Sequence, residues 1–207
     1  MSIASLDYLS VLPSGMAFED RRTRERAARH RLILSTARRL AEAEGWDAVT
    51  TRRLSTEIEY SQPVLYKHFS SMEDIAEAIA VEGFAELAGV LRAARADAGT
   101  GQCPLRPMAH AYLGFARDNP ALYDAMFIRA TKLRFAADDT PAPLVAAFAE
   151  LREGIATVAH GRDVDTLTEL LWAALHGLIT LARGGRLRPE YEAERIELLA
   201  AQFSVES

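Results

Sequence analysis

Apolar residues recur along this chain with the spacing of helices, and no stretch shows the apolar–polar alternation of a half-buried strand. Residues 22–44 contain neither Gly nor Pro, and Ile33, Ala37 and Leu40 fall on one helical face of that stretch. Gly45 follows at the position expected for a helix C-cap. The pattern therefore predicts a first helix over residues 22–44.

Two shorter helices are predicted directly after it. Thr50 is a good N-cap for a helix of about two turns, with Leu54 and Ile58 at its inward positions. Ser61 can cap the next helix, because Pro63 then lies in the first turn, where its missing N–H costs nothing. Two short helices joined by a turn of three or four residues and backed by a longer helix are typical of a helix-turn-helix module.

A long fourth helix is predicted from its N-cap Ser71 to about Ala96. Residues 97–107, with two Gly and two Pro, read as a loop. Apolar periodicity then predicts five further helices, near residues 107–118, 120–134, 141–160, 164–183 and 189–203. The predicted fold class is all-α, with about nine helices in an N-terminal helix-turn-helix module and a C-terminal helical domain.

We expect three parts: a flexible N-terminal arm at residues 1–19, the helix-turn-helix module at residues 20–71 and a C-terminal domain at residues 72–207. The arm has neither the basic region of a signal peptide nor an apolar run long enough to span a membrane. The only cysteine, Cys103, cannot form a disulfide within one chain. These features favour a cytoplasmic protein without membrane contact.

The formal charge is distributed unevenly along the chain. Residues 20–70 hold eleven Arg and Lys against seven Asp and Glu, whereas residues 71–207 hold thirteen against twenty, and the whole chain has a net charge of −5. A basic module on an acidic body is typical of a phosphate-binding module joined to a second domain. A solvated arginine-rich helix would give the same count, so charge alone leaves both interpretations open.

The most informative segment runs from Thr50 to Phe69 and reads TTRRLSTEIEYSQPVLYKHF. It closely resembles the DNA-binding motif of the tetracycline-repressor (TetR) family, and its second half resembles that family's recognition helix with its Leu-Tyr-x-His-Phe ending. The similarity spans about residues 28–80. It implies a homodimer that binds a palindromic DNA operator through the helix-turn-helix and a small-molecule effector through the C-terminal domain.

The resemblance places the base-reading residues near the starts of the second and third helices. Arg52 can present a planar fork to guanine O6 and N7, and Gln62 can pair with adenine N6 and N7. Pro63 and Val64 offer apolar surface to a thymine methyl group. These four residues are the candidates for specifying the operator sequence.

A second set of residues is expected to position the protein on the DNA. Ser61 and Lys67 are near enough to add base or phosphate contacts. The residues expected to bind phosphates without reading bases are Thr50, Thr51, Tyr66 and His68. Packing within a small helical domain is the alternative role for Tyr66 and His68, and it is the role that we expect of Phe69.

The motif departs from the family pattern at two positions. Glu59 stands where the turn usually has Gly, so either it accepts about 1 kcal/mol of strain or the turn takes another form. Met72 stands where a lysine commonly opens the fourth helix, so one phosphate contact per half-site is expected to be absent.

In the C-terminal domain, Trp172, His176 and Gly177 resemble the Trp-His-Gly signature of one subgroup of the family. Trp172 and His176 share a helical face, where they either line a ligand cavity or belong to the core. The candidate ligand-binding residues are mainly apolar: Met108, Tyr112, Phe115, Tyr123, Phe127, Trp172 and His176. The expected effector is a neutral or weakly polar, fairly apolar molecule, with Arg129 the one candidate to bind an acidic group on it.

The last two predicted helices, at residues 164–183 and 189–203, are apolar over more than one face. A monomer would leave part of this surface in water. As in the family, we expect these helices to pair with their copies in a second chain, which sets two recognition helices about 34–36 Å apart.

Enzymatic function is not expected. The five histidines lack metal-ligand spacing, and the chain has no glycine loop that would cradle a phosphate. We therefore expect no catalytic site, no metal and no cofactor. The leading hypothesis is a repressor that a small apolar ligand releases from its operator. The alternative is a DNA-binding regulator whose C-terminal domain only dimerises or binds a protein partner.

Overall fold

The structure is a computed structural model that describes residues 14–99, 102–129, 132–135 and 137–204. Within these ranges it consists of helices and connecting segments, without a strand. The helices are α1 (Ser14–Glu44), α2 (Thr51–Glu57), α3 (Gln62–Tyr66), α4 (Met72–Asp97), α5 (Leu105–Asp118), α6 (Pro120–Phe127), α7 (Ala142–Ala156), α8 (Val164–Arg183) and α9 (Glu192–Ser204), with short 3-10 helices at Trp46–Ala48 and Pro189–Tyr191. The predicted all-α fold class, with about nine helices, is confirmed over the residues that the structure describes.

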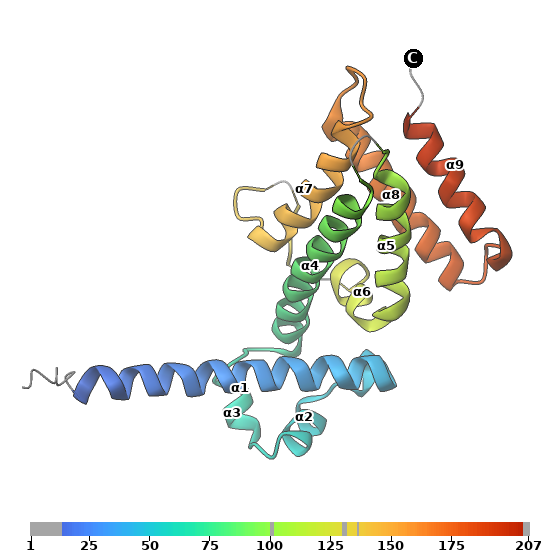
Figure 1. Cartoon of the computed structure of the whole chain (residues 1–207). Helices are drawn as coiled ribbons and strands as arrows, with labels where there is room; N and C mark the ends of the chain where they lie inside the picture. Colours follow the sequence, from blue (N-terminus) through green and yellow to red (C-terminus); the bar gives the residue numbers. More distant parts are fainter. Residues whose placement is uncertain (1–13, 100–101, 130–131, 136, 205–207) are drawn as a thin grey trace, which may run out of the picture.

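α1 lies across one end of the molecule, and α4 rises steeply from it into a body formed by α5 to α9 (Figure 1). Ile33, Ala37 and Leu40 of α1 are fully buried, as the periodicity predicts. Gly45 ends the helix with a φ of 84°, a conformation that glycine adopts without steric cost. The hydroxyl oxygen of Thr50 then accepts a hydrogen bond from the N–H of Arg53 at 3.1 Å and caps α2.

α4 is the central helix of the body. Its side chains Ile79, Phe84 and Leu91 are at most 2% exposed and pack among α5, α6 and α7. A Cβ atom at Gly83 would lie 2.7 Å from Sδ of Met126, so the absence of a side chain at Gly83 lets α6 approach α4 closely. α6, which begins with Pro120 directly after α5, is thereby held between α4 and the N-terminal module.

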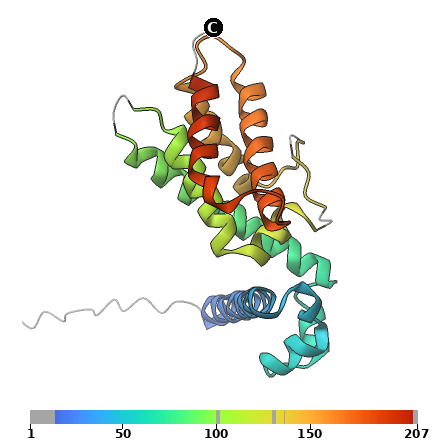
Figure 2. The same cartoon turned by 90° about the vertical axis from the view of Figure 1, so that its right-hand side faces the viewer.

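α8 and α9 lie side by side on one flank of the body (Figure 2). Three of their leucines stand in water in the single chain: Leu170, Leu181 and Leu198 are 56%, 42% and 59% exposed. The predicted apolar surface on the last two helices is therefore present. No helix among the described residues is both long and apolar enough to cross a lipid bilayer.

The junction between the N-terminal module and the body is polar and specific. The carboxylate of Glu42 accepts hydrogen bonds at 2.9 Å from the backbone N–H groups of Ala121 and Leu122, in the first turn of α6. The indole N–H of Trp46 donates to the carbonyl of Ala121 at 2.8 Å, and the guanidinium of Arg38 donates to Oδ1 of Asn119 at 3.0 Å. Three side chains of the N-terminal module thus form hydrogen bonds at the start of α6.

Three predicted boundaries are wrong. The predicted arm at residues 1–19 is helical from Ser14, because nothing between Gly15 and Glu44 breaks a helix that is already nucleated; residues 1–13 lie outside the described residues. α6 ends at Phe127 rather than near residue 134, since the chain turns so that the ring of Phe135 can pack on Trp172. α7 ends at Ala156 rather than residue 160, followed by a turn in which His160 adopts a φ of 48°.

Candidate DNA-binding and ligand sites

α2 and α3 lie on the side of α1 that faces away from the C-terminal body (Figure 1). The segment of four residues between them forms the turn, where Glu59 adopts a φ of 56°. Of the two alternatives raised by the sequence, Glu59 therefore follows the first. It adopts the left-handed backbone conformation that glycine takes more easily, at some cost in strain. This arrangement leaves the ends of both short helices open to a partner on the outer side of the module.

None of the ten predicted DNA-contact residues is buried. The exposed ones are Thr50, Arg52, Ser61, Gln62, Pro63, Tyr66 and Lys67, and the half-buried ones are Thr51, Val64 and His68. Leu65, between them, is 2% exposed and anchors α3 to the core of the module. Phe69 is buried and packs against His30 in a tilted arrangement with ring centroids 4.6 Å apart, so it packs as expected.

The two neighbouring arginines at the start of α2 differ in their partners. Arg53 forms ion pairs with Glu44 at 3.0 Å and with Glu57 at 3.3 Å. Arg52 is exposed and forms no ion pair with any described residue. Of the pair, Arg52 is therefore the one with a guanidinium available to an external acceptor.

Tyr66 and His68 differ in their surroundings. The side chain of Tyr66 is 56% exposed, which favours an external contact over packing. His68 is half-buried, and burial together with the nearby positive charges of Arg26 and Arg29 lowers its pKa. Met72 contacts the core instead of reaching outwards, and the adjacent Ser71 caps α4 by accepting the N–H of Asp74.

A chain of hydrogen bonds runs through the interior of the C-terminal domain. The indole N–H of Trp172 donates to the hydroxyl of Tyr112 at 3.1 Å, and this hydroxyl lies 3.4 Å from that of Tyr123. The hydroxyl of Tyr123 lies 2.8 Å from Nδ1 of His176, whose Nε2 lies 3.5 Å from Oγ1 of Thr180. The chain joins α5, α6 and α8 although its members are far apart in the sequence.

The partners of this chain determine the direction of its hydrogen bonds. The hydroxyl of Thr180 donates to the carbonyl of His176 at 2.9 Å, so its oxygen is left to accept from Nε2–H. Nδ1 of His176 then accepts from Tyr123, Tyr123 accepts from Tyr112, and Tyr112 accepts from Trp172. Every donor in the chain has an acceptor, which is what buried polar groups require.

Burial keeps these groups neutral. It raises the pKa of Tyr123 to about 12 and that of Tyr112 well above its ordinary value, and it lowers the pKa of His176. The interior therefore presents hydrogen-bonding groups without a formal charge near pH 7.

Two cavities adjoin this chain. The inner one has a volume of about 20 Å³ and is lined by apolar side chains and Tyr112, and the outer one, of about 450 Å³, is more open and has Arg129 and His176 in its lining. Phe127, Phe135 and Trp172 line both cavities and separate them.

The structure thus brings four of the seven predicted ligand residues to these cavities: Tyr112, Phe127, Trp172 and His176. Tyr123 belongs to the hydrogen-bond chain without lining either cavity. Met108 packs against Gly154 of α7, and Phe115 is buried in the core. Phe135, which sequence reasoning missed, lies in an irregular segment and carries no periodic signal.

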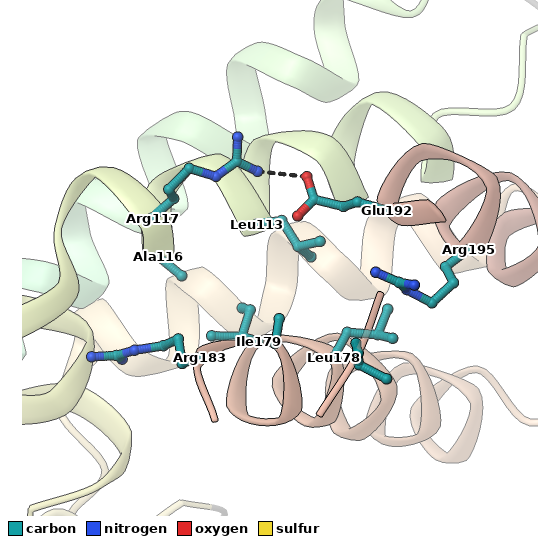
Figure 3. Close-up of a pocket in the computed structure, with 10 residues that line it drawn as sticks. Leu113, Ala116, Arg117, Leu178, Ile179, Arg183, Glu192 and Arg195 are labelled. Atoms are coloured by element: carbon teal, nitrogen blue, oxygen red, sulfur yellow. Dashed lines mark hydrogen bonds and ion pairs between the residues drawn. The ribbon is translucent and has the colours of Figure 1, made fainter. Parts of the chain in front are cut away.

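A separate slot of about 200 Å³ lies between α5, α8 and the start of α9 (Figure 3). Its floor is apolar, with Leu113, Leu178 and Ile179, and arginines stand around it. Arg117 pairs with Glu192 at 2.6 Å, while Arg183 pairs with Asp124 at 2.8 Å. Sequence reasoning missed this slot because its residues come from three helices and share no local pattern.

Two relatives are uncharacterized HTH-type transcriptional regulators. YobS of Bacillus subtilis is 30% identical over 102 residues, which cover 48% of this chain and 51% of that protein, so the match spans about half of its length. A regulator of Mycobacterium tuberculosis is 28% identical over 157 residues, which cover 74% of this chain and 69% of that protein.

The fold has solved counterparts. A protein of unknown function from Rhodococcus sp. RHA1 superposes with a TM-score of 0.67 at 24% identity, over 84% of this chain and 93% of that one. Two family models also match: the model of bacterial regulatory proteins of the tetR family covers residues 33–79, and that of the tetracyclin repressor-like C-terminal domain covers residues 105–203. Since both the DNA-binding module and the C-terminal domain match, the chain belongs to the TetR family of DNA-binding transcriptional regulators.

Proposed function

We propose that the protein is a cytoplasmic repressor without catalytic activity, which binds a palindromic operator as a homodimer and is released from it by a small apolar ligand. The observation that carries the DNA-reading part is the contrast at the start of α2. Arg53 is held by two carboxylates, whereas Arg52 stands exposed and unpaired among described residues, beside a recognition helix whose Gln62 is also exposed.

In this proposal Arg52 and Gln62 read bases, because a guanidinium fork matches guanine and an amide matches adenine in the major groove. Ser61, Pro63, Val64 and Lys67 add contacts around them. The remaining contacts, from Thr50, Thr51, Tyr66 and His68, go to phosphates and fix the register of the module.

Dimerisation through α8 and α9 is supported by the exposed leucines on these helices. Leu170, Leu181 and Leu198 are large apolar side chains that a second copy would cover. A twofold interface places the same residues of both chains against one another and orients the two modules symmetrically, as a palindrome requires.

Ligand binding is proposed at the inner cavity and its wall. The polar groups there already bond to one another, so a ligand gains most by burying apolar surface, and Arg129 lies only in the outer cavity. The aromatic wall of Phe127, Phe135 and Trp172 has to move to admit anything larger than a water molecule. A neutral, largely apolar effector fits these conditions.

Release follows if the ligand moves α6. The end of α6 carries Phe127 in the cavity wall, while its start is gripped by Glu42 and Trp46 of the N-terminal module. A shift of α6 with the ligand would alter the orientation of the module, provided that the ligand binds the shifted state more tightly than the DNA-bound state.

The volume of the inner cavity, about 20 Å³, favours a second candidate function. In it, the C-terminal domain only dimerises or binds a protein partner, and the aromatic interior is core. The two functions share the DNA-binding step and differ in their response to small molecules.

One experiment in two steps tests both. The purified protein first selects DNA from a random pool, where enrichment of a palindrome is expected and failure to enrich any sequence would contradict DNA reading. A panel of neutral aromatic and aliphatic compounds is then tested for release of the labelled operator from wild type and Trp172→Ala. Release from the wild type alone supports the proposal, and release by no compound supports the second function.

A further inference from the structure

The N-terminal half of α1 extends well past α2 and α3 (Figure 1). Residues 19–29 are exposed throughout, and burial along α1 begins only at Ile33. A helical extension without packing gains little stability of its own, since most helical stability in proteins comes from tertiary contacts. The exposed extension is therefore available to contact another molecule.

Three of its arginines lie on one face. Arg22, Arg26 and Arg29, named here the arginine stripe, are spaced by four and three residues and continue the line of Ile33 and Ala37. The stripe lines one hollow together with Lys67 and His68, so it lies on the side of α1 that faces the end of α3. It spans about 10 Å along the helix axis, at 1.5 Å per residue.

The stripe and the end of the recognition helix surround one hollow. Arg22, Arg26 and Arg29 line this open space of about 520 Å³ together with Lys67 and His68. Two residues predicted to touch DNA are thus neighbours of the stripe, across the hollow that separates α1 from α3.

The lining of the hollow carries a net positive charge, with Arg22, Arg26, Arg29 and Lys67 against Glu19 and Glu25. Arg22, Arg26 and Lys67 form no ion pair with any described residue, and Glu25, on its edge, is engaged by Arg21 at 2.9 Å and by Arg29 at 3.9 Å. The pKa of His68 is lowered by burial and further by the charges of Arg26 and Arg29. Cations in excess over the nearby carboxylates favour an anionic partner.

We propose that the arginine stripe binds phosphates of the DNA that flank the bases read by α3, so that each half-site extends beyond the helix-turn-helix. The inference rests on the proposed DNA reading and adds a second contact surface to it. Duplex DNA fits better than a membrane, because residues 19–29 contain small alanines but no large apolar side chain to enter a bilayer.

The salt dependence of operator binding tests this inference. For B-DNA the slope of log K against log salt falls by about 0.9 for each phosphate contact removed. Arg22→Ala/Arg26→Ala is expected to lower the slope by about 1.8, so that raising the salt from 50 to 200 mM weakens the wild type about tenfold more than this variant.

The matched control is Arg24→Ala/Arg31→Ala. These arginines lie on the opposite face of the same helix, are exposed and form no ion pair with described residues. Both variants lose two positive charges and exchange arginine for the best helix former, so a difference between them reports position rather than net charge or helix content. The control is expected to keep the wild-type slope to within about 0.3.

DNA length gives an independent readout. Trimming the duplex to the selected palindrome removes the flanking phosphates, so it should weaken the wild type and the control but leave Arg22→Ala/Arg26→Ala unchanged. Equal slopes for the two double variants, or equal sensitivity to trimming, would overturn the inference. Neither outcome would affect the proposed DNA reading, which fails only if the wild type selects no sequence.

Discussion

The carboxylate of Glu42, on α1, accepts the backbone N–H of Leu122, on α6, at 2.9 Å. A second oxygen of the same carboxylate accepts the N–H of Ala121. Free N–H groups at the start of a helix need acceptors, and a carboxylate suits the positive end of the helix dipole. The residue that caps α6 thus comes from the other domain, and the cap doubles as a joint between the two.

Breaking this joint should destabilise the protein. Glu42→Gln replaces one acceptor oxygen with an amide donor, so one N–H of α6 loses its partner and the free energy of unfolding should fall by about 2 kcal/mol. Urea denaturation measures this loss. Glu44→Gln, two residues away, breaks only an exposed ion pair with Arg53 and should cost less than about 1 kcal/mol. Equal losses in the two variants would show that the cap contributes no more than a surface pair.

The turn of the helix-turn-helix should be improved by glycine. Because Glu59 adopts a φ of 56°, Glu59→Gly should stabilise the protein relative to Glu59→Ala by about 1 kcal/mol in urea denaturation. In a right-handed helical conformation the order would be reversed, with alanine better by about the same amount. The sign of the difference between these two variants therefore tests the turn directly.

Stability should fall in mild acid because of His176. Its pKa is lowered by burial in the folded protein, so as the pH falls through about 6.5 the unfolded chain takes up the proton first. The free energy of unfolding then decreases with falling pH until the folded pKa is passed, where this contribution levels off.

Two variants test whether His176 is the cause of this pH dependence. His176→Gln should make the dependence between pH 7.5 and 5 shallower, as measured by urea denaturation at each pH. Tyr123→Phe removes a hydrogen bond but leaves His176 half-buried, so it should lower stability by about 1 kcal/mol and keep the dependence. An unchanged profile in His176→Gln would show that this histidine does not titrate differently on unfolding.

His68 should make operator binding depend on pH in the opposite sense. In the free protein, burial and neighbouring cations lower its pKa, whereas a DNA phosphate favours the protonated ring and raises it. Binding is then accompanied by proton uptake, so affinity should rise as the pH falls from 7.5 to 5.5 at constant ionic strength. Fluorescence anisotropy with wild type and His68→Gln checks this, since identical pH profiles would argue against a phosphate at His68.

Much of the fold could be predicted from local signals. α4 and α8 are long and periodic, and their caps Ser71 and Asp163 each accept a backbone N–H of the first turn, so sequence and structure agree closely there. The length of α6 is overestimated by the sequence because periodicity does not show where the helix ends. Beyond that end, Phe135 packs on Phe84 and Trp172, which is a tertiary contact. Periodicity within a helix carries no information about such a contact.

The candidate sites also divide into those that local sequence signals reveal and those that depend on tertiary contacts. Arg52 and Gln62, the proposed base-reading residues, lie in one contiguous motif, so the sequence alone is enough to propose them. The bond between Trp172 and Tyr112 joins residues sixty positions apart, and the arginine stripe depends on how far α1 extends past α3. Neither the Trp172–Tyr112 bond nor the arginine stripe can be predicted without knowing how the helices are arranged in space.

The proposed reading of a base by Arg52 can be tested by measuring operator affinity with single-base substitutions. Arg52→Ala should lose about 1–3 kcal/mol on the selected palindrome and should no longer discriminate bases at one symmetric position of each half-site. Arg53→Ala, whose arginine is held by Glu44 and Glu57, should discriminate at every position as the wild type does. If Arg52→Ala instead weakened binding equally to all sequences, Arg52 would be a phosphate contact and the claim would be contradicted.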